Sequence, residues 1–132
     1  MERKTSTPEE IAEQQEYAKQ VVMEELETHP EIKTQDEKIN FVRTTWVLSD
    51  EEQNSILHIT EENKEINPLL LDQTFALASF LKRKIIPDEL AKMIRTRAKA
   101  WDYKTALEAM SQGETERVLV ECHKVFDWNH TG

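Results

Sequence analysis

Turn-forming residues are scarce in this chain, which has only two glycines and four prolines among its 132 residues. A sheet of many short strands needs more of them, so we exclude an all-β fold. Glu, Lys, Ala and Leu, which favour helices, are plentiful. Because a chain of this length suits one hydrophobic core, we expect a single all-α domain over residues 1–132. It should be a compact bundle of about five to seven short and medium helices, with flexible ends at residues 1–7 and 128–132.

Cysteine is almost absent too. The single Cys122 cannot form an intramolecular disulfide, which fits a reducing compartment. The chain opens with polar residues rather than with the apolar core of a signal peptide. Its longest apolar region, residues 69–81, is interrupted by polar side chains and is shorter than the roughly 20 residues that cross a bilayer. These features predict a cytoplasmic protein that does not contact membranes.

Motifs of catalysis and metal binding are also missing. None of the four histidines stands in a spacing that places two metal ligands on one helix face. There is no glycine-rich phosphate loop and no nucleophile elbow. Cys122 and His123 are neighbours, but successive helical side chains diverge by about 100°, so they do not form a nucleophile and its base. We therefore predict no enzyme activity, no metal and no cofactor.

What the chain has in abundance is signals of helix ends. The expected helix starts are Pro8 after Thr7, the capping pairs Thr34/Glu37 and Ser49/Glu52, Pro68 after Asn67, Pro87, a short helix capped by Asp102, and a last helix after Gly113. The first helix should end at His29-Pro30, and the helix that begins at Pro87 should run to about Trp101.

Apolar residues at helical spacing indicate which sides are buried. In the first helix the expected buried residues are Ile11, Ala18, Val22 and Leu26, with Glu13, Glu16, Glu24, Glu25 and Glu27 on the solvated sides. In the last helix they are Val118, Leu119, Cys122, Val125 and Phe126, which makes Cys122 a small core residue rather than a reactive thiol. Residues 68–81 are apolar nearly all round and should form the central helix, surrounded by the others or offering part of its surface to a partner.

Charge is distributed unevenly along the chain. Residues 82–104 carry eight Lys or Arg and three Asp or Glu, whereas residues 1–67 have a net charge of −10 and the whole chain −9. On a helix from Pro87 to about Trp101, the side chains of Lys92, Arg95 and Lys99 would form a basic stripe. The candidate binding residues are the basic and aromatic side chains of this region: Lys82, Arg83, Lys84, Lys92, Arg95, Arg97, Lys99, Trp101, Tyr103 and Lys104. Trp46 and Trp128 are further candidate anchors, because Trp, Tyr and Arg dominate interface hot spots.

Two functions compete for these residues. We predict first a small non-enzymatic binding or regulatory protein that acts through contact with a protein partner. The alternative is a transcriptional regulator that binds nucleic acid through the basic helix 87–101, although the net negative charge opposes it. A helix-turn-helix over residues 73–95 does not fit, because Phe80 and Lys82 stand where that motif usually needs Gly for its turn.

Residues 105–114 resemble the toxin-binding end of Xre/ParS-type antitoxins, so the regulator could be antitoxin-like. The Asn-Pro-rich stretch that precedes this end in the antitoxins is absent, and the resemblance covers too little of the chain to assign a family. A third hypothesis is an acidic surface that mimics nucleic acid and occupies a basic groove on another protein. The opposite charges of the two regions also allow a homodimer that salt would weaken.

Overall fold

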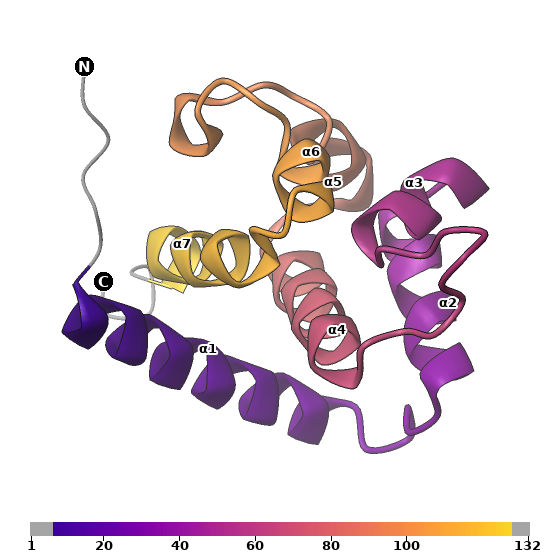
Figure 1. Cartoon of the computed structure of the whole chain (residues 1–132), viewed down its shortest axis with the longest axis horizontal. Helices are drawn as coiled ribbons and strands as arrows, with labels where there is room; N and C mark the ends of the chain where they lie inside the picture. The colour runs from indigo at the N-terminus through magenta and orange to yellow at the C-terminus, as the bar shows by residue number, and fades with distance from the viewer. Residues whose placement is uncertain (1–6, 128–132) are drawn as a thin grey trace.

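The computed structural model describes residues 7–127, which form seven α-helices and one 3-10 helix (Figure 1). They are α1 (Pro8–Thr28), α2 (Gln35–Trp46), α3 (Asp50–Ile56), α4 (Pro68–Lys84), α5 (Pro87–Met93), η1 (Lys99–Trp101), α6 (Ala106–Ser111) and α7 (Thr115–Asp127). The expected all-α bundle of five to seven helices is confirmed. Of the ends expected to be flexible, residues 1–6 and 128–132 lie outside the described residues.

Side chains at the helix N-termini explain where most of the helices begin. Capping boxes, in which a side chain and a backbone N–H bond reciprocally across one turn, occur at Thr7/Glu10, Thr34/Glu37, Ser49/Glu52 and Thr105/Glu108. Asn67 caps α4 by accepting from the N–H groups of Leu69 and Leu70. The expectation that Asp102 caps the sixth helix is wrong. Thr105 caps it, because Glu108 completes the box three residues later, whereas Asp102 has a left-handed backbone.

Helix α4 is the centre of the bundle. It contacts α1 and α7 on one side and α2 and α5 on the other, while α3 and α6 pack on each other beside it (Figure 1). Every residue from Gln73 to Leu81 is buried, including Phe75 and Phe80. The expected central helix is therefore confirmed, and it is surrounded by the other helices.

Two residues expected to be buried are exposed. Ile11 lies in the first turn of α1 and lines a pocket there, and the residues of α7 that line the same pocket are mostly charged: Arg117, Glu121 and Lys124. Val125 lies near the C-terminal end of α7 and lines a different pocket that is described below. The rest of both stripes is buried or partly buried, and Cys122 is in the core as expected.

The expectation that Glu25 faces solvent is also wrong. Its side chain is buried between α1 and α4, and only 3% of the residue's surface is exposed. The burial is tolerated because the carboxylate accepts a hydrogen bond from Ser79 Oγ (2.6 Å) and forms an ion pair with Arg83. Glu24, its neighbour, is exposed as expected.

The helix that begins at Pro87 ends at Met93, eight residues before the expected end near Trp101. The N–H groups of Arg95 and Thr96 bond to the carbonyls three residues earlier, so the helix tightens and stops. Arg95 then turns its guanidinium toward the carbonyls of Trp46 and Val47 at the end of α2. These contacts join residues that are far apart in the sequence, so no helical pattern could predict them. They override the local preference of these residues for a helix.

Candidate binding surface

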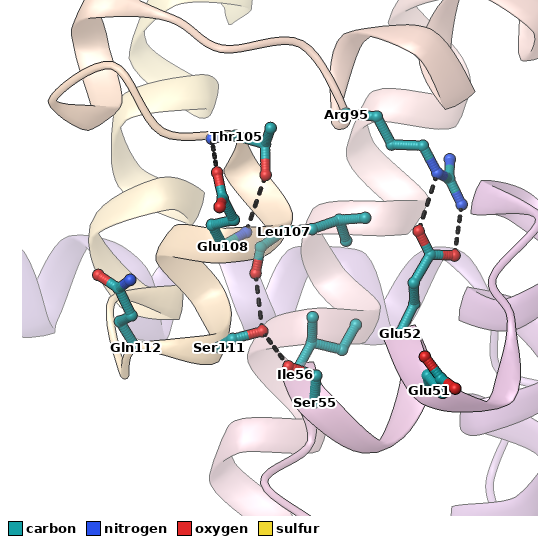
Figure 2. Close-up of a pocket in the computed structure, with 10 residues that line it drawn as sticks. All are labelled: Glu51, Glu52, Ser55, Ile56, Arg95, Thr105, Leu107, Glu108, Ser111 and Gln112. Atoms are coloured by element: carbon teal, nitrogen blue, oxygen red, sulfur yellow. Dashed lines mark hydrogen bonds and ion pairs between the residues drawn. The ribbon is translucent and has the colours of Figure 1, made fainter.

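One concave surface lies between α3 and α6 and has a volume of about 380 Å³ (Figure 2). It is rich in polar groups, and most of them bond to one another. Arg95 donates two hydrogen bonds to the carboxylate of Glu52 (2.8 and 3.0 Å), and the hydroxyls of Ser55 and Ser111 are 2.5 Å apart. The hydrogen bond from Arg95 holds the pKa of Glu52 below its ordinary value. These groups already have partners within the protein. We therefore interpret the groove as a contact between α3, α6 and the end of α5 rather than as a binding site.

A second site lies beneath the segment that joins α5 to α6, residues 94–105, called here the 94–105 segment. Ala98 is extended and donates its N–H to the carbonyl of Lys104 (3.1 Å), so the segment folds back on itself. Asp102 (φ 57°) and Tyr103 (φ 66°) both have left-handed backbones, which makes the reversal tight. The result is a small loop that holds Trp101 inward and exposes Tyr103.

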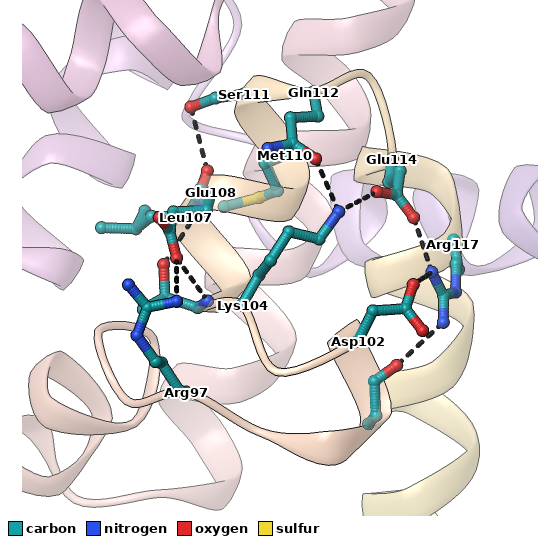
Figure 3. Close-up of polar contacts among 12 residues, drawn as sticks. Arg97, Asp102, Lys104, Leu107, Glu108, Met110, Ser111, Gln112, Glu114 and Arg117 are labelled. Carbon is teal, nitrogen blue, oxygen red and sulfur yellow. Dashed lines mark hydrogen bonds and ion pairs between the residues drawn. The ribbon is translucent and has the colours of Figure 1, made fainter.

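Side chains from α7 and its N-terminal turn brace this segment (Figure 3). Arg117 donates hydrogen bonds to the Ala100 carbonyl (2.9 Å) and to Glu114 (2.6 Å), and one of its nitrogens is 3.5 Å from Asp102. Lys104 Nζ donates to Glu114 (2.8 Å) and to Gln112 (2.6 Å). The hydrogen bonds from Lys104 and then Arg117 lower the pKa of the Glu114 carboxyl. The braced segment forms a fixed wall rather than an open loop.

Behind that wall is an apolar pocket of about 260 Å³. Twelve of its fourteen lining residues are apolar, and they come from α4, α5, the 94–105 segment, α6 and α7: Leu77, Leu81, Met93, Ile94, Ala98, Ala100, Trp101, Ala106, Val118, Cys122, Val125 and Phe126. The other two are Thr96 and Glu121. Pockets for small molecules usually measure about 300–1,000 Å³, so this one suits a single large side chain better than a whole metabolite.

Cys122 forms part of the pocket wall. Burial, with the nearby Glu121 carboxylate as a smaller cause, raises the pKa of its thiol from 9.0 to about 12. The thiol is therefore protonated at neutral pH, and it acts as an apolar wall group rather than as a nucleophile.

Among residues 7–127, Glu121 is the only charged residue that lines the pocket. It is exposed, and no hydrogen bond or ion pair joins its carboxylate to the rest of residues 7–127. The two cations nearest to it on α7 are directed elsewhere. Arg117 braces the 94–105 segment, and Lys124 Nζ lies over the ring of Tyr17, 5.3 Å from the ring centroid. The pocket therefore has an unpaired negative charge in its lining.

The predicted basic residues at the end of α4 have contacts within the protein. Arg83 pairs with the buried Glu25, Lys82 lies 5.0 Å from the centroid of the Phe41 ring, and Lys84 lies 5.5 Å from that of Phe80. Their position in the last turn also suits the negative end of the helix dipole.

The basic stripe of Lys92, Arg95 and Lys99 does not exist as a helix face, because α5 ends at Met93. Arg95 turns inward to Glu52, whereas Lys92 and Lys99 are exposed on different elements. Within residues 7–127, ion pairs with carboxylates engage at least four of the eight cations in residues 82–104, namely Arg83, Arg95, Arg97 and Lys104. At least half of the cations of the basic region are therefore neutralised within the protein.

The four predicted aromatic anchors differ in burial and in what surrounds them. Trp46 is fully buried between the helices, so its role as a surface anchor is wrong; it packs in the core because α2 turns its apolar side to α4. Trp101 is buried as well, but its ring lines the apolar pocket. Tyr103 is 64% exposed on the same segment, and Arg97 donates to its carbonyl (3.1 Å). Trp128 lies outside the described residues.

Neither the pocket nor Glu121 was predicted. The pocket depends on the path of the 94–105 segment, which a helix to Trp101 would have abolished. The sequence did contain a signal for Glu121. Counted from Val118, the apolar residues Cys122 and Val125 stand at i+4 and i+7, and Glu121 stands at i+3 on the same side of the helix. A carboxylate inside an apolar helix stripe is a candidate for a site of binding.

Metal sites and membrane-spanning helices are the two other features that bear on function. Within residues 7–127 no group of three or more His, Cys, Asp or Glu side chains is placed to hold a metal ion. No helix in that range combines the length and the apolar character needed to span a membrane.

The chain was also compared with known proteins. No protein-family model, no curated protein and no solved structure matches it. The function must therefore be inferred from the site itself.

Proposed function

We propose that this protein is a non-enzymatic binding module that engages a protein partner, and that an apolar side chain of the partner enters the pocket beneath the 94–105 segment. The observation that carries the proposal is the pocket: about 260 Å³ with twelve apolar lining residues and a braced wall. Interface energy is concentrated where a large side chain fills such a pocket. Tyr103, exposed on the same segment, supplies an aromatic contact beside it.

A peptide library displayed on phage tests this proposal. It is selected against the wild type and against Ala100→Trp, which places a large side chain at an exposed lining position without removing the Ala100 carbonyl that Arg117 holds. Selected peptides should contain a Leu, Ile, Met, Phe or Trp anchor and bind the variant at least about tenfold more weakly. Ala12→Trp, on the exposed side of α1, is the matched control and should bind like the wild type. Equal binding to wild type and Ala100→Trp would contradict the proposal.

Binding to nucleic acid has less support. It relied on a continuous basic helix, and α5 ends too early to present one. Ion pairs among residues 7–127 engage at least four of the eight cations in residues 82–104, and the net charge of −9 opposes approach to a phosphate backbone. Fluorescence anisotropy with a labelled duplex in about 50 mM salt should show no binding, since low salt gives electrostatic contacts their greatest strength.

A further inference from the structure

The part of the chain that the structure describes contributes one charge to the lining of the apolar pocket, that of Glu121. Its carboxylate is exposed at the pocket and pairs with no group in residues 7–127. A carboxylate accepts charge-assisted hydrogen bonds, which are shorter and stronger than neutral ones. The chemistry that complements this site is therefore an apolar group with a cation beside it.

The basic residues around the pocket do not reverse this conclusion. Figure 3 shows that Arg97, Lys104 and Arg117 point toward carboxylates of the protein. Arg97 faces Glu108 at 3.5 Å, Lys104 donates to Glu114, and Arg117 lies between Glu114 and Asp102. Because these cations already have anionic neighbours, none of them neutralises Glu121.

The charge of the whole molecule acts in the same direction. Residues 1–67 carry seventeen acidic and seven basic side chains, and the chain has a net charge of −9. A protein with this charge attracts cationic partners over distances of about a Debye length and repels anionic ones. The long-range field and the local carboxylate therefore select the same sign of partner.

We infer that the partner segment is basic: a large apolar side chain fills the pocket, and a Lys or Arg of the same segment pairs with Glu121. This inference rests on the proposed function and adds the chemistry of the partner. Arg fits better than Lys, because its planar guanidinium can donate two parallel hydrogen bonds to one carboxylate. A free hydrophobic amine or a second copy of the chain would be a different occupant, and the experiment below distinguishes them.

The test extends the peptide selection to Glu121→Gln, which removes the charge and keeps the shape, and to Glu121→Lys, which reverses it. Peptides selected on the wild type should be enriched in Lys or Arg near the apolar anchor. Glu121→Gln should weaken their binding about three- to tenfold, as expected for an exposed ion pair at the rim of an interface. Glu121→Lys should select peptides with Asp or Glu instead. Glu24→Gln, on the exposed side of α1, is the matched control and should leave binding unchanged.

Two results would overturn the inference and can be told apart. If the peptides lose affinity for Ala100→Trp but show no basic enrichment and bind Glu121→Gln normally, the basic partner is wrong and the pocket-based function stands. If no selected peptide is sensitive to Ala100→Trp, the proposed function fails, and with it the inference. Nuclear magnetic resonance titration with phenethylamine and light scattering then show whether a small amine or a second copy occupies the pocket in its place.

Discussion

Ser79 donates a 2.6 Å hydrogen bond from its Oγ to Oε1 of Glu25, across the interface between α4 and α1. The second oxygen of Glu25 pairs with Arg83, one turn further along α4. Both oxygens of a buried carboxylate therefore have partners. Sliding α1 along α4 by one turn would separate them and leave the charge unpaired, so this contact fixes the register of the two helices.

Replacing Glu25 by Ala should lower the free energy of unfolding by about 1–3 kcal/mol, because Ser79 loses its partner inside the protein. Arg83 can turn toward solvent, since 44% of its side chain is exposed, and this keeps the loss below that of a fully buried ion pair. Urea denaturation measures the change. Glu24→Ala on the exposed side of the same helix is the control and should leave the urea midpoint unchanged. Equal losses for the two variants would mean that the buried contact contributes nothing.

Val47 offers a test of backbone strain. This β-branched residue at the end of α2 has a left-handed backbone (φ 52°, ψ 55°), which costs an L-residue about 1–2 kcal/mol. Its side chain is 70% exposed, so little apolar contact is lost on its removal. Val47→Gly should raise the free energy of unfolding by about 0.5–1 kcal/mol, because the relief of strain exceeds the entropy that Gly adds to the unfolded chain.

Val47→Ala separates the two causes. Alanine keeps the Cβ atom that makes the left-handed conformation costly, so its stability in urea should stay near that of the wild type. A destabilised Val47→Gly would show that residue 47 leaves the left-handed region in solution. The hydrogen bond from Arg95 to the Val47 carbonyl would then have no role in holding the turn.

Local signals and distant contacts explain what the sequence could predict. The capping pairs Thr34/Glu37 and Ser49/Glu52 act within one turn, so both helix starts were predicted correctly. The end of α5 depends on Arg95, whose partner carbonyls lie 48 and 49 residues away. No pattern within a helix reports such contacts. The predicted basic stripe failed for this reason.

The candidate site followed the same rule. Trp101 and Tyr103 were predicted as binding residues from their chemistry, and the structure places them on one short segment, with Trp101 in the pocket wall. The pocket itself joins residues from Leu77 to Phe126 and exists only when the segment leaves α5 at Ile94. Its volume and its single charge are properties of the tertiary fold, and the sequence could not reveal them.

Acid should destabilise the protein through Glu52 and Glu114. The hydrogen bond from Arg95 lowers the pKa of Glu52, and that from Lys104 lowers the pKa of Glu114, both below the ordinary value of 4.5. A carboxyl whose pKa is lower in the folded state contributes stability above its unfolded pKa and loses it as the pH falls through its folded pKa. Urea midpoints should therefore be constant from about pH 7 to pH 5 and should fall below about pH 4.5.

The variant Glu52→Gln tests the origin of this acid sensitivity. It removes one of the carboxyls with a lowered pKa, so it should lower stability at pH 7 and flatten the decline below about pH 4.5. Glu51→Gln, at the exposed neighbouring position, should leave the decline as steep as in the wild type. A decline that Glu52→Gln does not flatten would place the acid sensitivity elsewhere in the chain.

Cys122 reports on the pocket directly. Burial raises the pKa of its thiol to about 12, which lowers the thiolate fraction at pH 8 by about a thousandfold, and the residue lines the pocket. Reaction with Ellman's reagent should therefore be at least about a hundredfold slower in the native protein than in urea, because only local opening exposes the thiol.

A cysteine placed on the exposed side of α1, Glu24→Cys in a Cys122→Ser background, is the control and should react at the rate of an unfolded chain. If native Cys122 reacts as fast as that control, the wall formed by the 94–105 segment opens readily, and a preformed pocket cannot be the source of binding energy. If it reacts slowly and a pocket-filling peptide slows it further, the peptide and the thiol occupy the same site.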